Sequence, residues 1–198
     1  VRGRAIGTPH RARRDKQELP VFGFDYLSAS ELQQQGAEVV DVKVLVAQCQ
    51  ATKCVFAHVV PQKGVDPDQY AVDRLVRDIQ WLGHTRVILK SDNEKAILNL
   101  LGQTLRTFRV EGLEQATQQH PAVYDPSSNG APEATCKRIG GMLRTLRSDF
   151  VSRFRRAPHI DHPIFAWLVE HASWILTSRV RLSDGRTPYE LARGSKFQ

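Results

Sequence analysis

Three acidic residues have sequence contexts that suit metal-ion chemistry. Asp25 lies inside an apolar, aromatic run, Asp92 directly follows a second apolar run, and Glu133 opens a long helical pattern. Burying a carboxylate without a compensating cation is costly, so we expect a positive charge near Asp25. Two clusters of carboxylate ligands that have one carboxylate in common can hold two Mg²⁺ ions about 3.5 to 4 Å apart. This spacing suits in-line displacement at phosphorus.

Each of these acids also has an ordinary structural explanation. Asp25 could pair with a buried arginine or accept backbone hydrogen bonds, since buried charges are usually paired. Asp92 stands at a predicted strand-to-helix turn, where an aspartate commonly caps the helix. Glu133 lies in a first helical turn, where acidic residues interact favourably with the helix dipole. Taken singly, none of the three identifies a site.

The helical pattern that follows Glu133 has a basic side. At about 100° per residue, Glu133 shares a narrow stripe with Lys137, Gly140, Arg144 and Arg147. The apolar residues of the pattern fall on the opposite side: Ile139, Met142, Leu143, Leu146 and Phe150. A carboxylate followed by a basic track suits a phosphodiester held beside metal ions. The alternative is an ordinary solvated charged face.

The chain offers strands that could position these residues. Apolar runs predict strands over 21–27, 42–50, 54–60 and 86–90, with a fifth near 107–110. We expect the first three to be antiparallel, whereas the strand over 86–90, followed at once by a helix, implies a parallel crossover. The prediction is a three-layer α/β fold with a mixed five-stranded sheet flanked by helices, with Asp25 and Asp92 on neighbouring strands.

Helical spacing of apolar residues predicts four helices and a final helical turn. The helices are expected over 68–82 with Gly83 as C-cap, around Ile97, Leu98 and Leu101, over about 132–150, and over 163–178. The last turn is opened by the capping-box pattern of Thr187 and Glu190, with Pro188 at the first helical position. These helices would cover both faces of the sheet.

Three segments lack such patterns. Residues 1–19 form a predicted basic, extended arm that precedes a single globular domain over 20–195. The polar segment 28–41 is long for a hairpin connection, and we interpret it as a surface excursion. Residues 120–130 are rich in Pro, Ser, Asn and Gly and predict a flexible loop.

Composition narrows the class of protein. A chain of 198 residues that is 41% hydrophobic can bury one sizeable core, and its net charge of +7 favours a polyanionic partner such as nucleic acid. No apolar run approaches the roughly 18 to 20 residues that span a bilayer, and no signal-type segment opens the sequence. The three cysteines, Cys49, Cys54 and Cys136, show no CxxC spacing, which argues against a disulfide framework or zinc finger. We expect a protein of the nucleus or cytoplasm, with no membrane segment.

In four ordered blocks the chain resembles the catalytic cores of retroviral and retrotransposon integrases, the D,D-E transferases. Three blocks carry the acids, and they are FGFDYL, VILKSDNEKAI and YDPSSNGAPEATCKRIGGMLRTL. The fourth, HPIFAWLVEHASWILTSRVRLSDGRTPYELARG, resembles the segment that ends integrase cores in retrotransposon polyproteins. The resemblance spans most of residues 21–193.

This resemblance implies a ribonuclease H-like fold and two Mg²⁺ or Mn²⁺ ions bound by Asp25, Asp92 and Glu133. It implies processing of DNA 3′ ends and strand transfer, with element ends and target DNA as partners and a dimer or tetramer as the assembly. Tyr124, Asn129 and Lys137 match positions that contact DNA in the family, and the basic stripe adds Arg144 and Arg147. The loop over 120–130 would clamp the DNA end.

One departure from the family pattern affects the third block. Ala131 and Pro132 stand where family members usually carry two small apolar residues, and proline lacks the N–H that an interior helical position needs. The helix therefore begins no earlier than Gly130, with Asn129 as its natural cap.

Two alternatives to an active integrase core remain. One is another nuclease or transposase on the same fold, and the other is a degenerate or domesticated core that only binds nucleic acid or protein.

Overall fold

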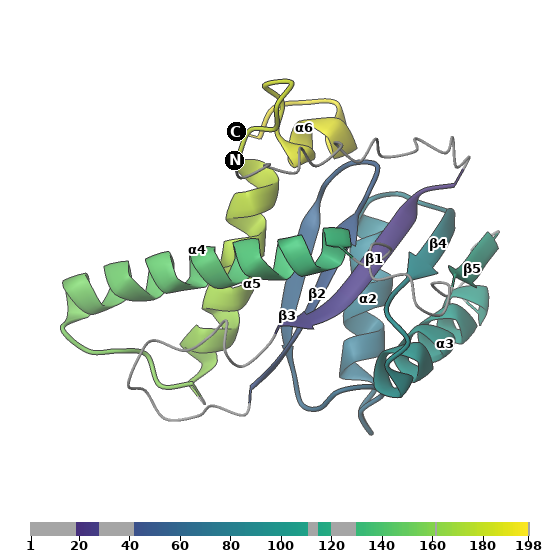
Figure 1. The fold of residues 1–198 in the computed structure, drawn as a ribbon, viewed down its shortest axis with the longest axis horizontal. Coiled ribbons are helices and arrows are strands. Elements are labelled where there is room, and N and C mark those ends of the chain that lie inside the picture. The colour runs from purple at the N-terminus through teal and green to yellow at the C-terminus, as the bar shows by residue number, and fades with distance from the viewer. Residues whose placement is uncertain (1–18, 28–41, 111–114, 120–129, 161, 198) are drawn as a thin grey trace, which may run out of the picture.

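Five strands form one mixed sheet in the order β3-β2-β1-β4-β5 (Figure 1). The computed structural model describes residues 19–27, 42–110, 115–119, 130–160 and 162–197. The strands are β1 (Val21–Leu27), β2 (Lys43–Cys49), β3 (Val55–Val60), β4 (Arg86–Lys90) and β5 (Gln115–Gln119). β1, β2 and β3 are antiparallel, whereas β4 pairs in parallel with both β1 and β5. The predicted antiparallel start and parallel crossover are therefore confirmed.

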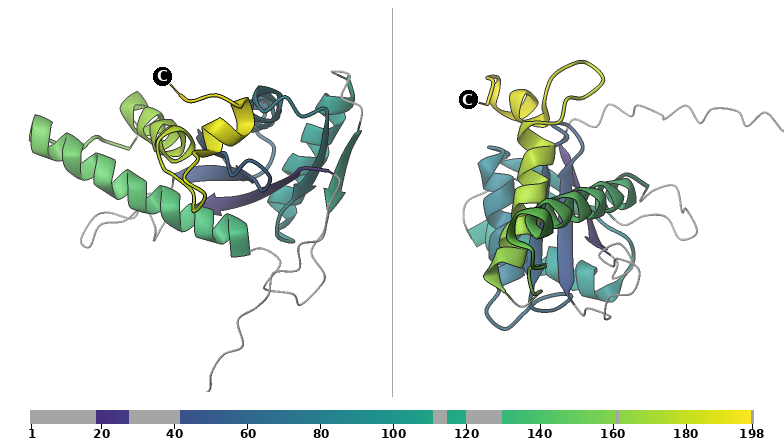
Figure 2. Two further views of the ribbon diagram at one scale, coloured as in Figure 1. Left: turned by 90° about the horizontal axis from the view of Figure 1, so that it is seen from above. Right: turned by 90° about the vertical axis from the view of Figure 1, so that its left-hand side faces the viewer.

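Helices cover both faces of this sheet, which confirms the predicted three-layer α/β fold (Figures 1 and 2). They are α2 (Tyr70–Trp81), α3 (Lys95–Val110), α4 (Gly130–Phe154), α5 (Pro163–Ser178) and α6 (Pro188–Arg193). α2 and α3 pack on one face, and α4 and α5 on the other. Among the described helices, none combines the length and the apolar character needed to cross a bilayer.

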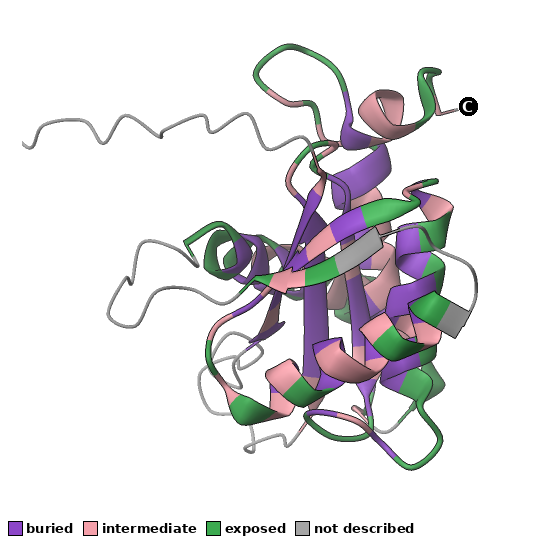
Figure 3. Ribbon diagram, turned by 90° about the vertical axis from the view of Figure 1, so that its right-hand side faces the viewer, coloured by how far each residue is buried: buried purple, intermediate pink, exposed green. Residues whose placement is uncertain are grey.

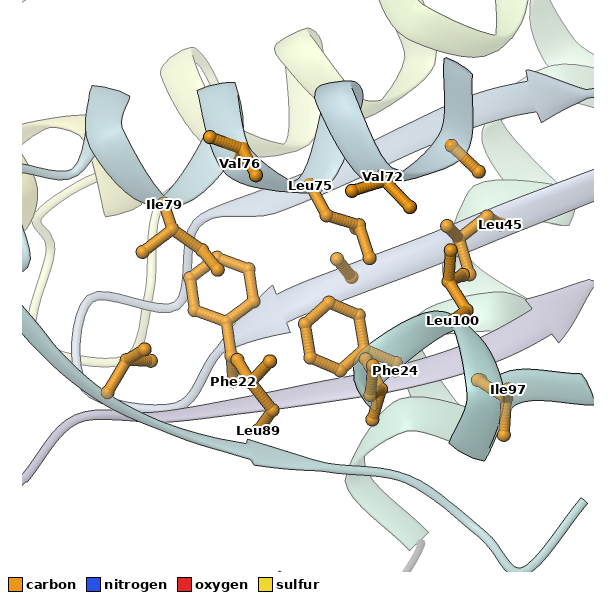
Figure 4. Close-up of a cluster of buried hydrophobic side chains, with 14 of the residues drawn as sticks. Phe22, Phe24, Leu45, Val72, Leu75, Val76, Ile79, Leu89, Ile97 and Leu100 are labelled. Atoms are coloured by element: carbon orange, nitrogen blue, oxygen red, sulfur yellow. The ribbon is translucent and has the colours of Figure 1, made fainter. Parts of the chain in front are cut away.

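The larger core fills the space between the sheet and the α2–α3 layer (Figure 4). Phe22 and Phe24 of β1 are fully buried there, with ring centroids 5.5 Å apart. Leu75 of α2 and Leu100 of α3 pack against the same strand. Burial of each such side chain contributes about 1.5–3 kcal/mol. Because side chains alternate along a strand, every second residue of β1 points toward the α2–α3 layer.

A second core joins the opposite face of the sheet to α4 and α5. Leu27 of β1 and Val46 of β2 meet Ile139 and Leu143 of α4, while Val169 of α5 is fully buried beside them. The buried strands between the two helical layers are evident in Figure 3. Asp25 follows the face-to-face alternation of β1 and so belongs to the α4 side.

The edge strand β3 is tied to the helices by polar contacts. The Thr177 hydroxyl of α5 lies 2.9 Å from the N–H and 3.0 Å from the carbonyl of Val55, which satisfies backbone groups at the edge. Buried His58 of β3 lies 2.8 Å from an Asp78 oxygen of α2 and 3.3 Å from a Glu170 oxygen of α5. One strand thus holds a helix from each layer.

The fifth strand lies elsewhere than the sequence suggests. Residues 107–110, predicted as a strand, form the last turn of α3, and Phe108 there is fully buried in the larger core. The prediction was wrong because it followed β-branched and aromatic composition, whereas Phe108 continues the helical spacing of Leu101 and Thr104, which are also fully buried. The actual β5 has the polar sequence QATQQ. Helix α4 also extends four residues beyond the predicted end at Phe150.

Three predicted segments fall largely outside the described residues: the arm over 1–19, the excursion over 28–41 and the loop over 120–130. The other predicted helices are present, including α2 with Gly83 in the left-handed conformation just past its end. The capping box of Thr187 and Glu190 is formed at the start of α6. The Thr187 N–H donates to the Glu190 carboxylate at 2.6 Å, and the Glu190 N–H donates to the Thr187 hydroxyl at 3.1 Å.

Candidate active site

Asp25 belongs to β1, and Asp92 follows the end of β4, the parallel neighbour of β1. The register of β1 and β4 pairs Gly23 with Lys90, and Asp25 and Asp92 each lie two residues further along the chain. Asp92 itself lies just past the end of β4, and both aspartates are half-buried. The two strands are neighbours in the sheet, as predicted, but Asp92 lies after β4 and not within it.

Helix α4 starts directly above β1 because Gly23 has no side chain. A Cβ built on Gly23 would lie 2.8 Å from Cγ of Pro132, closer than real Cβ contacts allow. On the neighbouring strand, the Thr135 hydroxyl donates to the Gln48 side-chain oxygen at 2.9 Å, and Gln48 is the β2 partner of Gly23. These two contacts fix the first turn of α4 over β1 and β2 (Figures 1 and 2).

Glu133 is carried by this first turn, next to buried Pro132. Pro132 and Thr135 face the sheet, whereas the Glu133 side chain is exposed. The helix begins at Gly130, as the position of the proline predicts, and the predicted cap Asn129 lies outside the described residues. Glu133 therefore belongs to the same face of the sheet as Asp25, but its side chain lies at the surface.

The donor types of this trio fit a hard divalent cation, because all three are carboxylates. The structure does not, however, bring them into a finished ligand set: within the described ranges, no group of three or more His, Cys, Asp or Glu side chains could hold a metal ion. Asp25, Asp92 and Glu133 all belong to those ranges. Asp25 and Asp92 belong to or follow two neighbouring strands, and Glu133 lies in the first turn of α4.

Local hydrogen bonds hold the two aspartates. Oδ1 of Asp25 accepts from the N–H of Tyr26 at 2.7 Å, and Oδ1 of Asp92 accepts from the N–H of Glu94 at 3.2 Å. The second contact is an Asx turn that leads into α3 at Lys95. Asp92 therefore does form the helix-entry contact that sequence position suggests, and its second carboxylate oxygen is not used by this bond.

A small network beside these acids could not be found from the sequence. The Tyr26 hydroxyl accepts from the N–H of Gly64 at 2.8 Å, Lys63 lies 5.0 Å from the Tyr26 ring centroid, and Lys63 pairs with Glu94 at 2.9 Å. Burial raises the pKa of Tyr26, and the negative charges of Glu94 and Asp92 raise it further. The network joins the end of β1 to the start of α3.

The basic stripe of α4 is only partly exposed. Lys137 and Arg144 are exposed, Arg147 is half-buried, and Gly140, which the helical spacing places in the same stripe, is buried. The apolar side behaves as predicted, since Ile139 and Leu143 are buried in the second core. The C-terminal part of α4 projects past the edge of the sheet (Figures 1 and 2). Tyr124 and Asn129, the predicted DNA contacts in the loop, lie outside the described residues.

Comparison with known proteins identifies the fold. No protein-family model matches the sequence, and no curated protein is similar to it. Among solved structures, the simian T-cell lymphotropic virus intasome in complex with PP2A regulatory subunit B56 gamma contains a chain with a TM-score of 0.59 and 18% identity. That match covers 91% of this chain and 57% of the other, so this chain spans little more than half of its length.

Two structures of the HTLV-2 integrase catalytic core domain in complex with magnesium, a trimeric and a dimeric form, are also similar. Each has a TM-score of 0.57 and 14% identity, and each match covers 88% of this chain and 98% of the core domain. The chain therefore has the α/β fold of a retroviral integrase catalytic core, of the ribonuclease H-like kind. The likeness is of fold, at low sequence identity.

Proposed function

We propose that this chain is the catalytic core of a retroelement integrase, a polynucleotidyl transferase that processes DNA 3′ ends and joins them to target DNA. The observation that carries the proposal is the parallel pairing of β1 with β4, because Asp25 lies two residues past Gly23 in β1 and Asp92 lies two residues past Lys90, the β4 partner of Gly23. The contact of Pro132 with Gly23 adds support, because it seats the helix that carries Glu133 over the same strand.

Two Mg²⁺ or Mn²⁺ ions would be held by Asp25, Asp92 and Glu133. When bound, such ions supply the positive charge that activates an attacking oxygen and stabilises a leaving 3′ oxygen. The chain's own task is to fix the ligands: the sheet sets the two aspartates, and the first turn of α4 brings Glu133. Glu133 is exposed, so its carboxylate is accessible to an incoming ion.

The substrate in this proposal is DNA, both the element ends and the target. Lys137, Arg144 and Arg147 on α4 would contact phosphates, which positions a duplex without reading its sequence. Tyr124 and Asn129 would contact the DNA end from the 120–130 loop. The HTLV-2 core domain was solved in dimeric and trimeric forms, and we expect this chain to form a homo-oligomer as well, a dimer or a tetramer.

The direct test is the joining of DNA ends by the Asp92→Asn variant. We expect Mg²⁺-dependent strand transfer to fall by at least about 100-fold, since the substitution removes a charged ligand while keeping the shape and the Asx-turn acceptor. The measurement is a strand-transfer assay with labelled oligonucleotide ends, and far-UV circular dichroism shows whether the fold is retained.

A matched control comes from Asp73, an exposed acid in the first turn of α2. Asp73→Asn removes the same charge away from the trio and should leave joining unchanged. Undiminished joining by a folded Asp92→Asn protein would refute the assignment of the site.

The exposed position of Glu133 favours a second candidate, a degenerate core that binds nucleic acid or protein without catalysis. Titration with Mn²⁺, followed by calorimetry, separates the two. A catalytic core binds Mn²⁺ and loses the binding in Asp25→Asn, whereas a degenerate core binds none. A related nuclease on this fold would cleave an RNA–DNA hybrid and fail to join DNA ends.

A further inference from the structure

Two cysteines face each other across the end of the β2–β3 hairpin. The register pairs Gln48 with Val55, so the next pair outward is Cys49 with Cys54, and the Cys49 N–H donates to the Cys54 carbonyl at 3.0 Å. Directly paired residues project from the same face of a sheet. Both side chains are fully buried in the core between the sheet and the α2–α3 layer.

Residues paired in this way have a typical backbone separation within the range that disulfides span. Hydrogen-bonded antiparallel partners have Cα atoms about 5.5 Å apart, and disulfides form at Cα separations of about 4.4 to 6.8 Å. Paired residues typically have Cβ atoms about 4.5 to 5.5 Å apart, against about 3.5 to 4.5 Å in a disulfide, so Cys49 and Cys54 need a small local movement toward each other to be bridged. Cys136 belongs to α4 and the second core, on the other side of the sheet.

The two thiols have different surroundings. Sγ of Cys49 lies 3.6 Å from Nε2 of His84. Burial acts to raise the pKa of Cys49, but hydrogen bonds from His84 and Thr52 outweigh it and lower that pKa below its ordinary value. The Cys54 thiol donates to the Pro188 carbonyl at 3.3 Å, and burial raises its pKa to about 11. Cys49 is thus the stronger candidate for attack, and Cys54 for the second step.

We propose that Cys49 and Cys54 form a thiol–disulfide exchange site whose co-reactant is a low-molecular-weight disulfide such as oxidised glutathione. The Cys49 thiolate attacks one glutathione sulfur, which forms a mixed disulfide and releases one glutathione thiolate. Cys54 then loses its proton to water, and its thiolate attacks the Cys49 sulfur, which forms the Cys49–Cys54 bond and releases the second glutathione. Two electrons pass from the cysteine pair to the glutathione disulfide, and the two thiol protons, lost to water, protonate the two released glutathione thiolates.

Local opening of the turn at residues 50–53 gives the co-reactant access to the pair. Ala51 and Lys53 are exposed, and Lys53 is held at φ 63°, a left-handed conformation that costs a non-glycine residue about 1 kcal/mol or more. Oxidation also removes the Cys54 S–H that donates to Pro188, the first residue of α6. The disulfide is therefore expected to loosen the start of α6.

The test is exposure of the folded chain to oxidised glutathione, followed by acid quenching, alkylation and peptide mass spectrometry. We expect a Cys49–Cys54 linkage with Cys136 still alkylated, and a rate at Cys49 on the order of tenfold or more above that at Cys136. In Cys54→Ala the reaction should stop at a mixed disulfide on Cys49. Cys49→Ala, with Cys49→Ser as a second variant if it folds poorly, should leave Cys54 reduced.

Equal reaction at Cys136, no reaction at any cysteine of the folded chain, or a mixed disulfide that forms first on Cys54 would each overturn the proposal. His84 acts as a positioning residue, and its test is a pH profile. In the Cys54→Ala background, His84→Ala should shift the pH midpoint of mixed-disulfide formation upward, whereas an unchanged midpoint would remove His84 from the site. None of these measurements depends on DNA joining.

Discussion

Gly23 shows how the absence of a single side chain can position a helix, here α4. The Cγ of Pro132 would lie 2.8 Å from a Cβ at position 23, and a proline ring in a helix has little freedom to move aside. We expect Gly23→Ala to lower the free energy of unfolding by about 1 to 3 kcal/mol, the usual cost of overpacking. Urea unfolding followed by circular dichroism measures the change.

A double-mutant cycle isolates this contact. If the clash is the cause, the pair Gly23→Ala and Pro132→Ala should recover most of the lost stability, whereas two simply additive losses would contradict it. Gly102→Ala is the matched control: a Cβ there meets nothing within 4 Å, and alanine in place of a helical glycine should stabilise by up to about 1 kcal/mol.

At the scale of single residues, the sequence singled out the three acids of the proposed metal site, but it did not predict the contacts that position them. The placement of Asp25 and Asp92 by neighbouring strands was predicted together with the overall fold, and β1 and β4 are neighbours in the sheet. The contact between Gly23 and Pro132 could not be predicted, because no local sequence pattern connects these two positions. From the sequence, Pro132 was interpreted only as a departure from the family pattern. The network of Tyr26, Lys63 and Glu94 depends on tertiary placement in the same way.

At the scale of elements, amphipathic segments were predictable and the polar edge strand was not. α2 and α5 carry apolar residues at helical spacing, and their bounds lie within two residues of the predicted ones. β5 has no apolar alternation, and it is a strand because it pairs with β4 over five residues. A segment whose structure comes from its neighbour's backbone leaves little signal in its own sequence.

His58 links three elements and gives the fold a pH dependence. Burial acts to lower its pKa, but the charge of Asp78 and hydrogen bonds with Asp78 and Glu170 outweigh this and raise it to about 9. The folded pKa lies above the ordinary value of about 6.5. The stabilisation by the charged form is therefore complete below about pH 6.5 and is lost as the pH rises through 9. Burial also raises the pKa of Asp78, which offsets part of the gain.

The variant His58→Gln lacks the titrating imidazole and should therefore lack this contribution to the pH dependence of stability. We expect the difference in unfolding free energy between the wild type and His58→Gln to shrink by about 1 to 3 kcal/mol between about pH 6 and pH 9.5. Urea unfolding at both pH values measures it. A difference that stays constant across this range would show that His58 does not change charge there.

At the scale of the whole molecule, the net charge of +7 and the basic stripe of α4 predict salt-sensitive DNA binding. We expect the double variant Lys137→Ala and Arg144→Ala to bind duplex DNA at least about tenfold more weakly. The slope of log K against log salt should fall by roughly 0.9 for each phosphate that the variant no longer neutralises. Fluorescence anisotropy at several salt concentrations gives both quantities.

Arg77 provides the control for that experiment, because it is exposed on α2, across the sheet from α4. Arg77→Ala removes one positive charge, as the single variant Arg144→Ala does, and should change the affinity and the slope far less than Arg144→Ala. Equal losses for Arg77→Ala and Arg144→Ala would mean that DNA is attracted by the overall charge and not by α4.

The fit of Pro132 over Gly23 has a consequence for the history of the chain. In relatives that keep a proline at position 132, any side chain at position 23 should be selected against, and a larger residue at 23 should appear only where 132 has changed. The two sites are thus expected to covary across lineages. Alignments in which they vary independently would indicate that other members seat this helix by a different contact.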